Sequence, residues 1–164
     1  GGVAYCRPEV VYYTARADID SVNRQASYTP GVKEGNMSKL TRSLRKCRAM
    51  ENALKEMKDP AAASEWLAQI RLLIADAHRK TWWLSGYAWD NVNREQALAY
   101  LRQLPEDSRE RVSMKLSILR TCHDRWFRWF RNDPEERVID GVSISARQLK
   151  MEIKDLERQL AASL

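Results

Sequence analysis

The chain contains few of the residues that interrupt helices or build all-β folds. Its 164 residues include six glycines, five prolines and two phenylalanines, which argues against a β-sandwich and favours helices. No apolar run approaches the ~18 residues that a membrane-spanning helix needs. Charged residues make up 30% and hydrophobic residues 44% of the chain, which is typical of a folded protein and not of a disordered one.

Cysteine and histidine are also scarce. Cys6, Cys47 and Cys122 are widely spaced and form no CxxC pair, so we expect buried or idle thiols in a reducing compartment. His78 and His123 lack partners at a zinc-binding spacing. No dinucleotide-binding glycine motif, Walker A motif, HExxH motif or EF-hand loop occurs. The sequence therefore predicts a non-enzyme with no catalytic, cofactor-binding or metal-binding residues.

Two groups of polar residues invite a catalytic interpretation, and a structural one explains each better. His123 and Asp124 are adjacent, and adjacent residues of a helix do not face each other. Glu106, Asp107 and Glu110 stand at the predicted start of a helix, where negative charge interacts favourably with the helix dipole. Neither group predicts an active site.

Basic residues are in excess, with 28 Lys and Arg against 22 Asp and Glu and a net charge of +6. Residues 38–58 carry seven basic and two acidic side chains, and residues 94–133 carry nine and six. This balance permits contact with nucleic acid, anionic lipid or an acidic protein surface. The charges of 38–58 are expected on several faces of a helix, as on an ordinary solvated surface.

The pattern of apolar residues divides the chain into an arm and a helical domain. Residues 1–37 show no sustained period and are predicted to form an extended arm, with a short helix near 14–24. The arm is rich in Tyr, so we expect it to lie on another surface. Residues 38–164 are predicted to form an all-α domain of about five helices in an irregular open bundle.

Capping signals mark the ends of these predicted helices, and no strand is predicted. Ser38, Asp59 with Pro60, Asn93, and Ser145 with Gln148 are expected at helix starts. Breaks are expected at Ser85-Gly86, at Pro105, and at Asn132-Asp133-Pro134.

Aromatic and arginine side chains gather at two places in the predicted helices. Trp82 and Trp83 point about 100° apart on a helix, so one core pocket cannot hold both. In residues 123–131 (HDRWFRWFR), Trp126, Phe127 and Phe130 are expected to face inward. This segment fits a core or protein interface, a helix at a membrane edge, or a surface that stacks on single-stranded nucleic acid. The candidate partner-contact residues are Tyr12, Tyr13, Trp82, Trp83, Trp89, Arg125, Arg128 and Trp129.

The stretch 101–107 (LRQLPED), followed by a long Arg-rich helix, resembles subunit 7 of the mitochondrial cytochrome bc1 complex, its small matrix-side subunit. Ser85-Gly86-Tyr87 and the box 89–92 (WDNV) stand where that family has a glycine-containing turn and an aromatic-acidic-aliphatic box. Asp133-Pro134 stands near a family proline stop. The order of features matches from about residue 81 onward, and residues 1–60 have no counterpart in the family.

The resemblance implies a non-catalytic structural or assembly subunit of the respiratory chain, without haem or metal. It would belong to ubiquinol-cytochrome c reductase (complex III) and lie peripherally on the matrix side of the mitochondrial inner membrane. Its partners would be other subunits, cytochrome b among them, and lipid headgroups at the membrane edge. The alternatives are an accessory subunit of complex I or ATP synthase, or a basic RNA-binding mitoribosomal protein, although nucleic acid ranks lower as a partner.

Overall fold

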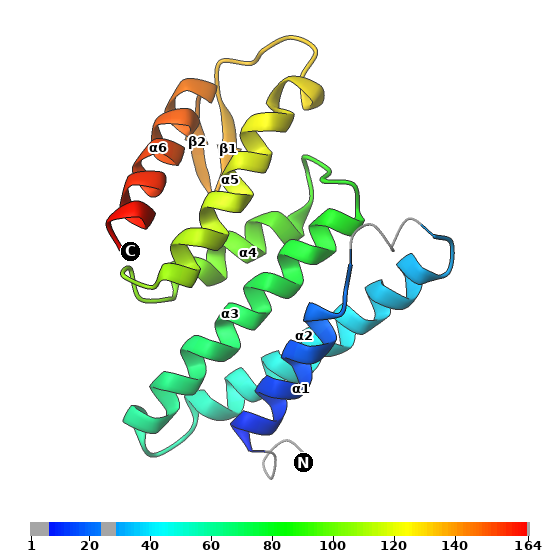
Figure 1. Ribbon diagram of the computed structural model, residues 1–164, viewed down its shortest axis with the longest axis vertical. Helices are drawn as coiled ribbons and strands as arrows, with labels where there is room; N and C mark the ends of the chain where they lie inside the picture. The colour runs from blue at the N-terminus through cyan, green and yellow to red at the C-terminus, as the bar shows by residue number, and fades with distance from the viewer. Residues whose placement is uncertain (1–6, 24–28, 164) are drawn as a thin grey trace. The chain divides into compact units, whose positions relative to one another are not determined.

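The computed structural model describes residues 7–23 and 29–163, which form six α-helices and one two-stranded sheet (Figure 1). The predicted all-α class is confirmed. Contacts within the chain define two compact units, residues 1–104 and 105–164.

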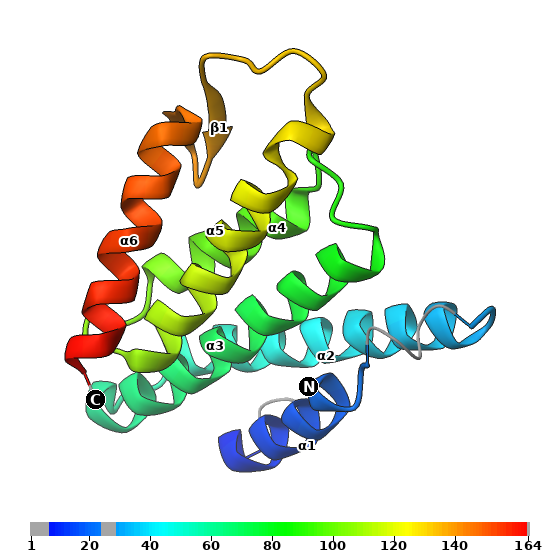
Figure 2. The same ribbon diagram turned by 45° about the horizontal axis from the view of Figure 1, so that its top comes forward.

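The first unit contains four helices: α1 (Pro8–Asp20), α2 (Val32–Lys55), α3 (Pro60–Leu84) and α4 (Val92–Arg102). Helix α3 packs against each of the other three, and α1 also packs against α2 (Figures 1 and 2). The apolar faces of α1, α2 and α3 share one core, in which the fully buried large side chains are Ile19, Leu40, Leu54, Ile70 and Ile74, and Tyr100 of α4 packs against it. Helix α3 is thus the central element of this unit.

The predicted extended arm is wrong over the described part of residues 1–37. Pro8 starts α1, and Tyr12, Ala15 and Ile19 follow at helical spacing and are buried. The burial of this stripe favours a helix over an extended chain. The expected helix near 14–24 therefore begins six residues earlier.

Helix α2 also begins earlier than predicted, inside the expected arm. Its N-cap is Gly31, whose backbone N–H donates to Glu34 Oε2 at 2.8 Å. Ser38 lies in the second turn and is not a cap. The Gly31–Glu34 bond satisfies a backbone donor at the helix start, so the helix needs no Ser at this position.

The ends of α3 agree with prediction, and the start of α4 differs by two residues. Asp59 Oδ1 accepts a hydrogen bond from the Ala61 amide at 3.2 Å, and α3 stops at Ser85 and Gly86. The N-cap of α4 is Asn91, whose Oδ1 accepts from the amide of Asn93 at 2.8 Å. Asn93, which the sequence predicts as the cap, instead has its Oδ1 2.8 Å from His78 Nδ1.

The second unit contains α5 (Arg109–Trp129), β1 (Arg137–Ile139), β2 (Val142–Ile144) and α6 (Ala146–Ala162). Helices α5 and α6 pack against each other. The predicted capping box at Ser145 and Gln148 is present, with bonds of 2.9 and 3.1 Å in the two directions. Lys115 Nζ lies 3.9 Å from Asp140 and 3.3 Å from Glu152, so one cation links α5 to the hairpin and to α6.

The β1–β2 hairpin is the element that the sequence prediction missed. The strands pair antiparallel, with Ile139 opposite Val142. Asp140 and Gly141 form the two-residue turn, with φ angles of 57° and 72°. Two successive positive φ angles are typical of a type I′ turn, for which Asp-Gly is a preferred sequence.

We expect two glycines to respond oppositely to substitution by Ala. Gly86 has φ +80° and no heavy atom within 4 Å of an added Cβ, so Gly86→Ala should destabilise the fold by roughly 1–2 kcal/mol through backbone strain alone. Gly35 lies inside α2 with equally open space, and Gly35→Ala should stabilise by roughly 0.5–1 kcal/mol. Chemical denaturation of both variants checks this. Equal signs would contradict the assigned backbone at residue 86.

Candidate functional site

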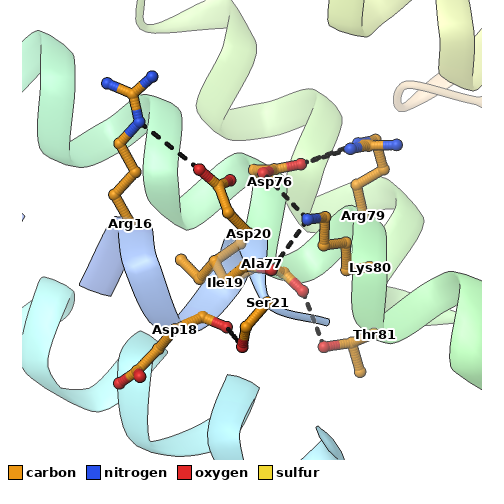
Figure 3. Close-up of polar contacts among 10 residues, drawn as sticks. All are labelled: Arg16, Asp18, Ile19, Asp20, Ser21, Asp76, Ala77, Arg79, Lys80 and Thr81. Carbon is orange, nitrogen blue, oxygen red and sulfur yellow. Dashed lines mark hydrogen bonds and ion pairs between the residues drawn. The ribbon is translucent and has the colours of Figure 1, made fainter. Parts of the chain in front are cut away.

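A buried lysine connects α3 to the end of α1 (Figure 3). Lys80 is 7% exposed, and its Nζ donates to the carbonyl oxygen of Ile19 at 2.8 Å. Ile19 lies in the last turn of α1, where a cation is favourable, and its carbonyl oxygen also accepts from the Val22 amide at 3.2 Å. Asp76 Oδ2 lies 4.0 Å from the same ammonium. We call Ile19, Asp76, Arg79 and Lys80 the Lys80 cluster.

Arg79 completes the charge balance of this cluster. Its Nε and Nη2 donate to Asp76 Oδ1 at 3.0 and 2.6 Å, so one carboxylate faces two cations. The Trp83 ring centroid lies 4.7 Å from the Arg79 guanidinium and 5.4 Å from Lys80 Nζ. Cation–π contacts of this kind stabilise the cations and cover part of the ring. Trp83 is therefore half-buried against its own helix.

A second polar group links α3 to α2 and α4, and we call it the His78 network. Its centre is His78, with Nε2 2.8 Å from Arg48 Nη2 and Nδ1 2.8 Å from Asn93 Oδ1. A guanidinium only donates, so Nε2 accepts and Nδ1–H donates to Asn93. Both ring nitrogens are therefore used when the imidazole is neutral. The members of the network are Arg48, Glu51, Arg71, His78, Asn93 and Tyr100.

The environment of His78 favours its neutral form. Burial lowers the pKa of His78, the hydrogen bond to Asn93 opposes this change, and the positive charge of Arg48 adds to it. The ring of Tyr100 stacks on the imidazole with centroids 6.2 Å apart. A proton on Nε2 would leave two donors facing each other at Arg48.

Glu51 holds the other end of the network. It is 5% exposed, accepts from Arg71 Nε at 3.0 Å and accepts from the Tyr100 hydroxyl at 3.3 Å. Burial raises the pKa of Tyr100, and the negative charge of Glu51 raises it further. The members of the network satisfy one another, which fixes the packing of α2 and α4 on α3.

Two of the eight candidate partner-contact residues lie in the core, which corrects their predicted place on the surface. Trp82 is 1% exposed, its Nε1 donates to the Ala88 carbonyl at 3.0 Å, and Tyr87 packs edge-on at 4.9 Å. Tyr12 is 9% exposed and packs against Trp66 with centroids 5.9 Å apart. Tyr12 belongs to the core cluster of the first unit, and Trp82 is buried with its indole N–H already paired, so neither ring is available to a partner.

The other candidates from the first unit reach solvent to different degrees. Tyr13 is 63% exposed and lies edge-on to Tyr12 at 5.1 Å. Trp89 is half-buried: the Arg94 guanidinium lies 4.4 Å from its ring centroid, and Arg94 Nη1 donates to its carbonyl at 2.9 Å. Their role in partner contact stays a prediction, as it does for Trp83.

The Arg-aromatic segment at the end of α5 is oriented partly as predicted. Trp126 is buried, and its Nε1 donates to Asp133 Oδ1 at 2.7 Å. Phe130 packs edge-on to Trp126 at 5.5 Å and lies under the Arg137 guanidinium at 4.6 Å. Phe127 was expected inward and is 66% exposed, because it lies about 100° around the helix from Trp126.

The remaining candidates flank this exposed phenylalanine. Arg128 is exposed, and Arg125 and Trp129 are half-buried. Phe127, which sequence reasoning placed inside, is the large aromatic that this segment offers to a partner. A helical wheel that places Trp126 at the centre of the buried face puts Phe127 about 100° away and predicts its exposure.

The two described cysteines are buried and lie outside the Lys80 cluster and the His78 network. Cys47 and Cys122 are buried, and burial raises the pKa of the Cys47 thiol to about 12. Cys6 lies outside the described residues.

Over residues 7–23 and 29–163, no helix is both long enough and apolar enough to cross a membrane. In the same ranges, no group of three or more His, Cys, Asp or Glu is placed to hold a metal ion.

Comparisons of the chain with protein-family models, with curated proteins and with solved structures found no match.

We expect His78 to make the stability of the fold depend on pH. The folded pKa is lowered, so below about pH 6.5 the unfolded chain binds a proton that the folded chain does not. This contribution to stability is complete above that pH and is lost as the pH falls below it. Denaturation curves from acidic to neutral pH should show the loss.

The matched variants for this test are His78→Gln and His123→Gln. The first removes the buried titrating group and should flatten the slope of unfolding free energy against pH. The second removes a half-buried histidine of α5, which is not a member of the His78 network, and serves as the matched control. An unchanged slope in His78→Gln would contradict the proposed coupling.

We expect Lys80→Met to loosen α1. The substitution keeps the apolar stem and removes the charged donor to the Ile19 carbonyl, which retains only the Val22 amide. Loss of a hydrogen bond from a charged group costs about 1.5–3 kcal/mol. Amide hydrogen exchange should then accelerate in α1 more than in α2. Lys46→Met on the exposed face of α2 is the control and should change stability by less than about 0.5 kcal/mol. Similar effects of the two variants would argue against the buried contact.

Proposed function

We propose that this protein is a non-catalytic accessory subunit of the mitochondrial respiratory chain, belonging to ubiquinol-cytochrome c reductase (complex III). It packs peripherally on the matrix face of the complex, beside cytochrome b and neighbouring subunits. The observation that carries the proposal is the ordered resemblance to subunit 7 from about residue 81 to the C-terminus.

The positions of the resembling motifs support the proposal. Ser85-Gly86-Tyr87 forms the turn that ends α3, and Asn91 of the WDNV box caps α4. Residues 101–107 end α4 and precede the Ser108 cap of α5. Each of these motifs lies at a helix boundary. The resemblance to subunit 7 therefore concerns the order of the helices as well as short matching sequences.

The exposed aromatic at the end of α5 supports a role in binding another protein. Phe127 is 66% exposed beside the exposed Arg128. Aromatic and arginine side chains contribute most of the binding energy in many protein interfaces. Phe127, exposed beside an exposed arginine, fits an anchor that a neighbouring subunit covers.

The buried polar groups of the first unit support a scaffold role. The Lys80 cluster and the His78 network use their charged groups on one another, across four helices. Such satisfied networks specify a single packing arrangement. A rigid unit of this kind presents its surface side chains at fixed positions to neighbouring subunits.

Co-fractionation tests the proposal. A tagged chain should migrate with cytochrome b on native gels of detergent-solubilised mitochondrial membranes, and its depletion should lower the abundance of complex III. Migration with complex I, with ATP synthase or with ribosomal RNA would overturn the assignment to complex III and favour the corresponding alternative.

The double variant Phe127→Ala/Arg128→Ala tests the contact surface. We expect at least about a tenfold loss of co-fractionating protein with unchanged folding, because both side chains are exposed. The control is Lys150→Ala/Met151→Ala, which removes an exposed cation and an exposed apolar side chain from α6 of the same unit. Equal losses in the two variants would place the contact elsewhere.

A further inference from the structure

One face of α2 is lined with cations that no carboxylate of the described chain pairs with. Arg42, Arg45 and Lys46 are exposed, and among residues 7–23 and 29–163 their side chains have no ion pair or hydrogen bond. On α1, by contrast, Arg16 Nε lies 3.6 Å from Asp20 Oδ2. We call Arg42, Arg45 and Lys46 the α2 basic face.

The absence of counter-charges has a cause inside the fold. From residue 35 to its end, α2 contains one carboxylate, Glu51, which is turned into the core and bound to Arg71. The flanking cations are also engaged, Lys39 with the Ser21 hydroxyl at 2.8 Å and Arg48 with His78. The three cations of the face are thus left for an external anion.

The spacing brings the three charges together. Residues three and four apart lie on the same side of a helix, and Arg42 and Lys46 are about 6 Å apart along the axis. Like charges at this spacing repel one another, and a bound anion relieves the repulsion. An array of phosphate groups fits such a face.

Helix α2 lacks the features that single-stranded nucleic acid and membrane insertion require. It contains no aromatic residue, so it offers no aromatic ring on which a base could stack. Leu40, Met50 and Leu54 face the core, and the exposed large apolar side chain of α2 is Val32 at its first residue, so the helix has no exposed apolar stripe to insert into acyl chains. Contact with phosphate groups at the headgroup level of a membrane requires neither feature.

We propose that the α2 basic face binds the phosphate headgroups of an anionic phospholipid surface. The inference rests on the proposed function, which places the protein against the inner membrane. The contact is electrostatic and leaves α2 outside the acyl region. Its strength follows the charge of the face and the anionic lipid content of the surface.

Helix α6 offers a matched control. Arg147, Lys150 and Lys154 are exposed, lie at helical spacing and have no ion pair among the described residues. On α6, however, carboxylates are interleaved with the cations, namely Glu152, Asp155 and Glu157. Removing either trio changes the net charge equally, so the pair of variants separates a specific face from overall charge.

The experiment is flotation of the full-length chain with vesicles of roughly one-third phosphatidylglycerol in phosphatidylcholine. Binding should be absent with phosphatidylcholine alone and should weaken as salt is raised. Arg42→Ala/Arg45→Ala/Lys46→Ala should lower the partition coefficient about 100-fold, or about fivefold per cation. Arg147→Ala/Lys150→Ala/Lys154→Ala should lower it far less.

Arg42→Lys/Arg45→Lys changes the same two arginines but keeps their charge, and it should retain binding. Retained binding would show that the loss in the alanine variant comes from the lost charge and not from misfolding. Circular dichroism checks that all variants keep the native helix content. The proposal is overturned by equal losses on α2 and α6, by binding to neutral vesicles, or by retained binding in the α2 triple variant. It is also overturned if labelled single-stranded RNA binds through the α2 face more tightly than the vesicles at the same salt.

The outcome is separable from that of the proposed function. Vesicle binding without co-fractionation with cytochrome b would leave a lipid-binding protein outside complex III. Co-fractionation without vesicle binding would mean that protein contacts alone hold the subunit, and the lipid inference would fail.

Discussion

Lys80 places an ammonium group at a position that is 7% exposed, and a charge removed from water needs compensation from its surroundings. The Ile19 carbonyl and Asp76 provide it, so α1 is held where its last turn meets α3. The same helix uses Arg71 to hold α2 and His78 to hold α4. The packing of the first unit therefore depends on polar groups of α3 that are satisfied only when all four helices are in place.

This internal pairing determines the character of the surface. Glu51 and Asp76 are withdrawn from solvent to neutralise cations of α3, and their negative charges are lost to the exterior. The net charge of +6 is modest for the whole chain, yet positive charge is concentrated on α2 because Glu51, its one carboxylate after residue 34, points inward. The unpaired cations at Arg42, Arg45 and Lys46 are thus a consequence of how the core is built.

Signals contained within a few residues were sufficient for much of the fold. Asp140-Gly141 is such a signal as well, and it was missed because three-residue strands show too little alternation to be recognised. The spacing of Tyr12, Ala15 and Ile19 was also readable, but the surrounding Tyr and Val suggested an extended segment. The signals that placed helix boundaries correctly were Asp59 with Pro60, Ser85 with Gly86, and Ser145 with Gln148.

The candidate site was less predictable because it depends on tertiary partners. The sequence shows that Trp82 and Trp83 diverge, but only the position of the Ala88 carbonyl decides that Trp82 is the buried one. The choice between Trp126 and Phe127 depends in the same way on Asp133, which accepts the indole N–H and leaves the phenyl ring outside. An indole needs a hydrogen-bond partner when buried and a phenyl ring does not. The buried member of each pair is therefore the tryptophan for which the loop after its own helix supplies an acceptor, and the ring beside it is left for other contacts.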